Sequence, residues 1–160
     1  MVSYLDFSKH HTVAESTDLL GTEFGEHIYN IKMAEDHDNG VILGVGDYVE
    51  FDYFDEAKAT GFEGKILMQN ANGSWMVRTT KAADGDVLIL SVPMTAYEFE
   101  SEAMAERQFY NGAGDIARAY QLRYGDRFSL SKEGFTSEPS DADIGKTVTV
   151  DNATGKLVIA

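Results

Sequence analysis

The feature that most constrains the fold of this sequence is the recurrence of two-residue turn signals between short runs of strand-forming residues. Gly-Asp pairs occur at Gly46-Asp47, Gly85-Asp86, Gly114-Asp115 and Gly125-Asp126. Glycine accepts the positive φ that a turn requires, and an aspartate side chain can accept hydrogen bonds from the backbone amides that follow it. The runs 48–51, 87–90 and 127–130 come directly after three of these pairs. We therefore predict that Gly46, Asp47, Gly125 and Asp126 are structural residues of turns that lead into strands.

Further turn signals predict hairpins. Asn39-Gly40 separates the runs 27–34 and 41–45, and Asn72-Gly73 separates 65–69 from 74–79; Asn-Gly is the preferred pair of a two-residue hairpin turn. A longer glycine-containing loop, 151–155, separates 147–150 from 156–159. Together these signals predict a mainly β fold, a small single-domain barrel or sandwich of short antiparallel strands. The run 87–92 is apolar on both faces, which predicts a central strand.

Two segments depart from this pattern. Thr95 and Glu98 have capping-box spacing and 102–108 is rich in helix formers, which predicts one short helix after a short strand. Residues 1–24 are polar and have no strand or helix period, with Tyr4, Leu5 and Phe7 as isolated apolar side chains. We expect an N-terminal arm over residues 1–24 that orders against a partner, followed by a β-rich domain over 25–160. A loose terminus is the alternative.

The charge of the chain excludes several partners. Its 160 residues carry 13 Lys and Arg against 27 Asp and Glu, a net charge of −14. Binding to nucleic acid or to anionic membranes depends on cationic side chains, so we expect neither partner. There is no cysteine and no apolar stretch near the roughly 20 residues that span a bilayer. A solvated exterior, a DNA mimic, or a subunit packed on a large assembly would each suit this charge. Acids interleaved with aromatics over 50–55 favour a half-buried strand over a DNA mimic.

No motif predicts catalysis or a metal site. The sequence lacks Gly-x-Ser-x-Gly, and His10 and His11 are adjacent, so on a strand their side chains would point apart. The segment 36–40 resembles the start of a calcium loop, but the glycine falls at position 5 instead of 6. The 27 acidic residues give many chance pairs of carboxylates, so the sequence does not single out a catalytic carboxylate pair of the glycosidase type. We expect no enzyme activity, no metal and no cofactor.

Arg118 stands among apolar residues. Strand alternation would place it on one face with Ile116, Tyr120 and Leu122. A buried arginine requires a carboxylate partner, so we predict that Arg118 is buried in a salt bridge beside Tyr120 and has a structural role. A ligand-binding arginine is the alternative.

An ordered set of short motifs resembles a known family. These are Asp38-Asn-Gly40 with Val45-Gly-Asp47-Tyr-Val49, then Phe109-Tyr-Asn-Gly-Ala-Gly114, Ala117-Arg-Ala-Tyr120, Gly125-Asp126-Arg-Phe-Ser129 and Ile144-Gly-Lys146 before a terminal hairpin. From about residue 27 to the end, the chain resembles the capsid decoration (head cement) proteins of tailed bacteriophages. It departs from them in an insertion-like segment, 97–107, and in its acidity.

The resemblance implies a structural virion protein on the outer surface of the capsid, where it clamps the lattice of the phage major capsid protein. It implies neighbouring copies as partners, with a trimer as one arrangement, and no catalysis or cofactor. Tyr4, Leu5 and Phe7 could then be partner-binding anchors.

The residues are also compatible with two other functions. A carbohydrate-binding or host-receptor-binding β module would use some of the 9 Phe, 8 Tyr and 1 Trp as ligand platforms, although Trp75 lies in a strand pattern typical of a core residue. A small β-fold enzyme is the third possibility.

Overall fold

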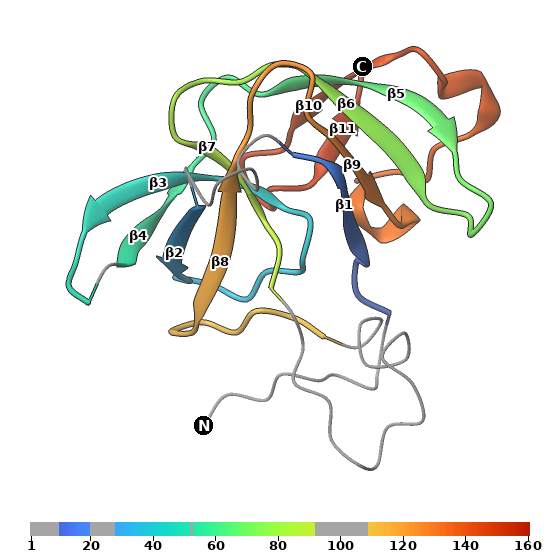
Figure 1. Ribbon diagram of the computed structural model, residues 1–160. Helices are drawn as coiled ribbons and strands as arrows, with labels where there is room; N and C mark the ends of the chain where they lie inside the picture. Colours follow the sequence, from blue (N-terminus) through green and yellow to red (C-terminus); the bar gives the residue numbers. More distant parts are fainter. Residues whose placement is uncertain (1–9, 20–27, 52, 92–108) are drawn as a thin grey trace.

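A computed structural model describes residues 10–19, 28–51, 53–91 and 109–160, which form two β layers (Figure 1). The first layer is a six-stranded antiparallel sheet with the order β1-β9-β6-β5-β10-β11. Its strands are β1 (Ala14–Asp18), β9 (Arg127–Leu130), β6 (Trp75–Lys81), β5 (Glu63–Gln69), β10 (Thr147–Val150) and β11 (Leu157–Ile159). Two short 3-10 helices, η2 (Lys132–Gly134) and η3 (Asp141–Asp143), lie between β9 and β10.

The second layer is a closed barrel with the order β2-β4-β3-β7-β8. Its strands are β2 (Ile28–Lys32), β4 (Tyr53–Lys58), β3 (Ile42–Tyr48), β7 (Asp86–Ile89) and β8 (Ile116–Gln121). The pair β2–β4 is parallel, and the barrel closes through the antiparallel pair β2–β8. The predicted mainly β fold is therefore confirmed. The predicted helix at 102–108 and the strand before it lie outside the described residues.

Two hydrophobic cores hold the layers. One fills the barrel and contains Ile31, Met33, Val87 and Ile89. The other lies between the layers, where Leu88 from the barrel meets sheet residues such as Trp75 and Phe128. Successive residues of β7 thus point into different cores and are all buried, which confirms the prediction of a strand covered on both faces.

Local turn signals predicted some pairings correctly and others wrongly. The hairpins β5–β6, at Asn72-Gly73, and β10–β11 are confirmed. Asn39-Gly40 does form a turn, but β2 and β3 are not partners, since β4 lies between them in the barrel. A turn pair fixes only the local chain reversal, whereas the partner of each strand depends on distant residues. The hairpin predicted there is wrong.

Of the predicted Gly-Asp turns before strands, two are confirmed and one is wrong. Gly85-Asp86 and Gly125-Asp126 lead into β7 and β9 as predicted, with positive φ at both glycines. Gly46-Asp47 instead lies inside β3, beside an irregularity in the β3–β4 register, so the predicted turn is wrong. A Cβ at Gly46 would lie 2.7 Å from the backbone oxygen of Asp55, so the close approach of β4 requires glycine here.

Residues 10–19 belong to the folded domain and not to an arm. β1 pairs with β9 at the edge of the sheet, and Leu19 is buried in the core between the layers. The Asp38 carboxylate contacts the ring of His11 and accepts a hydrogen bond from the Thr12 backbone N–H at 3.3 Å. The expected arm over 1–24 is wrong for these ten residues, whose irregular polarity conceals an edge strand. Residues 1–9 and 20–24 lie outside the described residues.

Candidate interaction surfaces

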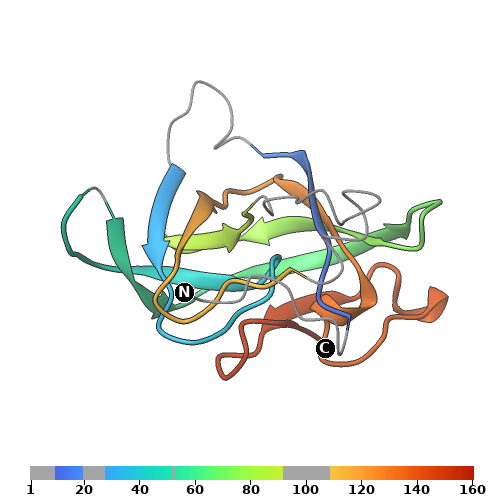
Figure 2. The same ribbon diagram turned by 90° about the horizontal axis from the view of Figure 1, so that it is seen from below.

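The β3–β4 hairpin projects from the barrel, at the left of Figure 1, and a quarter turn shows the same projection (Figure 2). Its strands pair at Gly44 with Ala57 and at Val45 with Glu56 before the register shifts. The Val49 N–H donates to the Tyr53 carbonyl at 3.0 Å and so closes the end of the hairpin.

This end, residues 48–51, is named the hairpin tip. Tyr48 is 60% exposed, Val49 36% and Phe51 83%. Phe51 has φ of 57°, the one positive φ outside glycine in the described part of the chain. A bulky side chain in the left-handed region is strained by about 1–3 kcal/mol. The turn therefore holds an exposed aromatic side chain at a conformational cost.

Aromatic rings behind the tip hold it in place. The Tyr48 ring lies edge-on to Phe54 at 5.7 Å, and Phe54 lies edge-on to Tyr29 of β2 at 5.6 Å. Such pairs each contribute about 0.5–1.5 kcal/mol beyond the area they bury. The exposed acids Asp47, Glu50 and Asp55 flank these apolar groups, so the tip combines aromatic side chains with negative charge.

Sequence reasoning missed this site because it assigned 48–51 to a strand. The alternation of acids and aromatics over 50–55 is real, but the turn falls inside it. A signal that could have found the tip is the absence of a positively charged residue from 33–57 in so acidic and aromatic a stretch.

The second surface lies on the outer face of the six-stranded sheet. Alternation along β6 buries Trp75, Val77 and Thr79 and leaves Arg78 exposed. In register, Arg78 is the direct partner of Lys65 on β5 and of Arg127 on β9. We name these three residues the cationic strip. Like charges directly opposite each other on adjacent strands destabilise a sheet.

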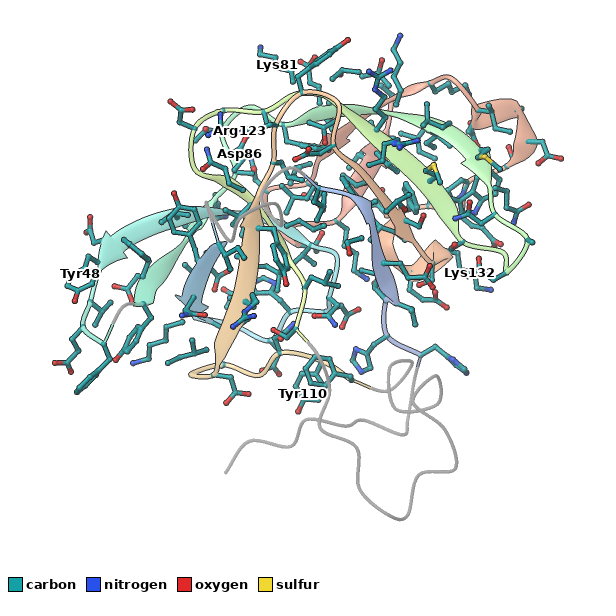
Figure 3. All side chains as sticks on the ribbon, viewed as in Figure 1. Tyr48, Lys81, Asp86, Tyr110, Arg123 and Lys132 are labelled. Carbon is teal, nitrogen blue, oxygen red and sulfur yellow. The ribbon has the colours of Figure 1, made fainter. Side chains whose placement is uncertain are left out.

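An aromatic residue extends the strip. The Arg78 guanidinium lies 5.4 Å from the ring centroid of Tyr124, which is 74% exposed. Leu67 and Met68 on β5 are also exposed, at 38% and 49%. Lys81 ends β6, the strand that carries Arg78. Figure 3 shows Lys81 at the top of the molecule, well separated from Tyr48 at its left end. The β5–β6 hairpin brings Lys65 and Arg78 together, and the distant strand β9 adds Arg127, so the complete strip depends on the pairing of β6 with β9.

The predicted burial of Arg118 is wrong. Arg118 is exposed, Ile116 is 52% exposed, and Ala117 and Ala119 point into the barrel instead. A closed five-stranded barrel has little interior volume, and large side chains such as Ile31 and Met33 occupy it, so β8 turns its small residues inward and its long ones outward. Among the described residues no carboxylate forms an ion pair with Arg118. Tyr120 is half-buried and packs against the core between the layers.

The other predicted residues have separate places. Asp126 is buried, and its carboxylate accepts a hydrogen bond from the Arg123 N–H at 2.9 Å, which supports its structural role in the turn before β9. Gly125 donates to the Thr79 carbonyl at 2.9 Å. Tyr4, Leu5 and Phe7 lie outside the described residues, so their partner-binding role stays a prediction.

Two buried histidines pair with carboxylates near the 36–40 segment. His37 contacts Glu56, and His11 contacts Asp38 and stacks on Tyr110 at 5.3 Å (Figure 3 labels Tyr110). Within the described ranges no group of three or more His, Asp or Glu residues is arranged to hold a metal ion. These pairs tie the connection between β2 and β3 to the rest of the fold.

A cleft of about 490 Å³ opens beside β1 and the β5–β6 turn. Its walls include Glu15, Asn72, Glu133 and Glu138, and Trp75, which is 4% exposed, also lines it. No helix in the described part of the chain is long and apolar enough to cross a membrane.

Comparison of the chain with protein-family models, with curated proteins and with solved structures finds no match in any of the three.

Proposed function

We propose that this chain is a structural subunit that binds the outer surface of a tailed-phage capsid lattice and stabilises the head. The observation that carries the proposal is the hairpin tip, where Tyr48, Val49 and Phe51 are exposed at the end of a projecting hairpin. Exposed apolar groups gathered on one projection are typical of a protein-binding site. The motif resemblance supports a capsid as the larger assembly.

The conformation of Phe51 also supports binding. A glycine at this φ would relieve the strain, yet the sequence has phenylalanine with 83% of its surface exposed. The side chain contributes little to the chain's own core, so its benefit has to come from a partner. Burying such a side chain at an interface contributes about 1.5–3 kcal/mol before ordering costs. Multiplied over a lattice, modest contributions of this size stabilise a shell.

The N-terminal residues supply a second expected contact. Because β1 fixes residues 14–18 at the edge of the sheet, Tyr4, Leu5 and Phe7 precede a firmly held strand. We keep them as expected anchors for the major capsid protein. A position on the outer surface would also keep a chain of net charge −14 away from packaged DNA.

Binding to undecorated shells tests the proposal. Shells of the phage that encodes this chain, prepared without it, should bind the purified protein in a saturable ratio and resist heating to a higher temperature once decorated. No saturable binding, or no change in the temperature at which shells open, would refute the proposed function.

The variant Phe51→Gly separates binding from folding. It should leave the urea midpoint of the isolated protein unchanged or higher, because glycine suits the positive φ. It should weaken shell binding by about tenfold, since an aromatic anchor is lost. Ile144→Ser is the matched control, because Ile144 is 45% exposed on another part of the surface. Equal shell binding by Phe51→Gly and the wild type would show that the tip is not an anchor.

The cleft favours one alternative, a carbohydrate-binding module. Its amide and carboxylate side chains could hydrogen-bond sugar hydroxyls, but Trp75 is too deeply buried to serve as a stacking platform. A glycan array tests this alternative: specific glycan binding that Asn72→Ala or Glu138→Ala abolishes would favour it over the capsid function.

A further inference from the structure

The cationic strip is a costly arrangement that the fold of a single copy does not explain. Lys65 and Arg78 are direct cross-strand partners, and both are exposed. Within the described ranges no carboxylate forms an ion pair with either side chain. With acids in twofold excess over cations in the whole chain, two cations facing each other without an acid partner require a reason. An anionic partner on this face would supply one.

The hairpin tip has the complementary chemistry. It presents exposed Tyr48 and Phe51 with the exposed acid Glu50, and the exposed acids Asp47 and Asp55 flank it on β3 and β4. The strip offers positive charge beside the exposed ring of Tyr124 and the exposed side chains of Leu67 and Met68. Carboxylates can pair with Lys65 and Arg78, and an aromatic face can receive a guanidinium. Both the charged and the apolar parts of the two surfaces therefore match.

One copy cannot bring its own tip to its own strip. The tip lies at the far end of the β3–β4 hairpin, which extends away from β5 and β6 in both views (Figures 1 and 2). The tip also belongs to the barrel layer and the strip to the outer face of the opposite layer. Any contact between them has to join two molecules.

We infer that the hairpin tip of one copy binds the cationic strip of a second copy of this chain. This inference rests on the proposed function, because it names the partner of the same tip: the neighbouring copy on the shell. The two surfaces differ, so the contact is heterologous, and it forms a closed ring or an open row according to the rotation between copies. The N-terminal residues are left to contact the capsid protein.

Site-specific cross-linking tests the contact directly, because the natural chain has no cysteine. Val49→Cys places a thiol on the tip, and Met76→Cys places one on the outer face of β6 beside the strip. Lys132→Cys is the control, since Lys132 is exposed elsewhere (Figure 3). Under mild oxidation, mixed Val49→Cys and Met76→Cys proteins should form about tenfold more mixed dimer than Val49→Cys with Lys132→Cys. Equal yields in solution and on decorated shells would overturn the inference.

Charge exchange provides an independent test. Lys65→Glu with Arg78→Glu reverses the strip and changes the net charge from −14 to −18, because each substitution subtracts two charges. Asp47→Lys with Asp55→Lys reverses the tip and changes it to −10. Each double variant alone should lose about tenfold in cross-linking yield. All four substitutions in one chain restore both the net charge of −14 and the complementarity, so the yield should return.

The control for this test is Lys58→Glu with Lys132→Glu, which also gives −18 but leaves both the strip and the acids around the tip intact, because both lysines are exposed and lie outside these surfaces. It should cross-link as the parent does. If the control loses as much yield as the strip variant, or if the fourfold variant does not recover, total charge and not the tip–strip contact governs association. Strip-dependent binding to a heparin column without any cross-linked dimer would assign the strip to a polyanion instead and also overturn the inference.

The two proposals fail separately. If the wild-type protein does not bind shells but the tip–strip cross-link forms in solution, the capsid function is wrong and the contact between copies stands. If shells are bound and stabilised but no tip–strip cross-link forms on them, the capsid function stands and the tip has another partner.

Discussion

Replacing Asp86 with alanine should destabilise the protein more than any surface change. Asp86 is 1% exposed, and its carboxylate accepts three backbone hydrogen bonds: from Thr60 at 2.9 Å, Gly61 at 3.1 Å and Ala83 at 2.9 Å. These bonds connect the turn before β7 to the loop after β4. They thus join the barrel to the loop that leads into β5 of the six-stranded sheet. Asp86 therefore links the two layers through hydrogen bonds to the backbone.

The magnitude follows from the donors that would lose their acceptor. A buried backbone N–H left without a partner costs about 1–3 kcal/mol. For three donors, of which some can reach water after local relaxation, we expect a loss of about 3–5 kcal/mol in the free energy of unfolding. Asp86→Asn keeps one carbonyl oxygen as an acceptor and should lose about half as much. A domain of this size would lose roughly 10 °C in Tm for Asp86→Ala.

Trp75 supplies the assay, because it is the single tryptophan and is buried in the core between the layers. Its fluorescence should follow urea unfolding of the wild type and the variants. Asp84→Ala is the control, since Asp84 is exposed in the same turn and should change stability by less than about 0.5 kcal/mol. A loss below about 1 kcal/mol for Asp86→Ala would refute the reasoning that the three bonds act together.

Three further predictions test other parts of the fold. Arg118→Met should change the free energy of unfolding, measured in urea, by no more than about 0.5 kcal/mol, because the side chain is exposed; a loss of several kcal/mol would mean that Arg118 is buried after all. Leu19→Ala should cost about 2–5 kcal/mol in unfolding experiments, and a neutral result would return residues 10–19 to a loose arm. The Asp143 carboxyl, whose pKa is lowered to about 2 by hydrogen bonds from Lys146 and then Ser140, should titrate near that value by NMR and move toward 3.8 in Lys146→Met. Because the pKa is lower in the folded chain, this contribution to stability is complete above about pH 4 and is lost as the pH falls through 2.

Local signals in the sequence predicted those parts of the fold that depend on neighbouring residues. The Asn72-Gly73 turn lies between strands that pair with each other, so composition, turn and partner agree. Asn39-Gly40 has the same chemistry, but β2 pairs with β4 and β8 and not with β3. The choice of strand partners depends on which distant apolar faces together fill the barrel. A single sequence does not show which distant strands will be neighbours.

The candidate site was harder to predict for a related reason. The face on which Arg118 lies depends on whether the barrel interior accepts large or small residues, and closure of the barrel selected Ala117 and Ala119. The cationic strip depends on the register of the β5–β6 hairpin and on its pairing with β9, which lies about 50 residues later in the chain. The tip was visible in composition, but the turn that exposes Phe51 was hidden in a pattern of strand type.

The way the two layers close has a consequence for how the protein is made. Tyr29 of β2 donates a hydrogen bond to Gln121 at the end of β8, 92 residues later, and Val13 beside β1 donates to Ser131, 118 residues later. Neither layer can be completed until the ribosome has released most of the chain. Folding dominated by such distant pairs is slow, and Ile31 and Met33 have no barrel to enter while synthesis continues. We therefore expect that a nascent chain truncated before β8 remains unfolded and aggregation-prone, and that chaperone binding, where it occurs, centres on the first barrel strand.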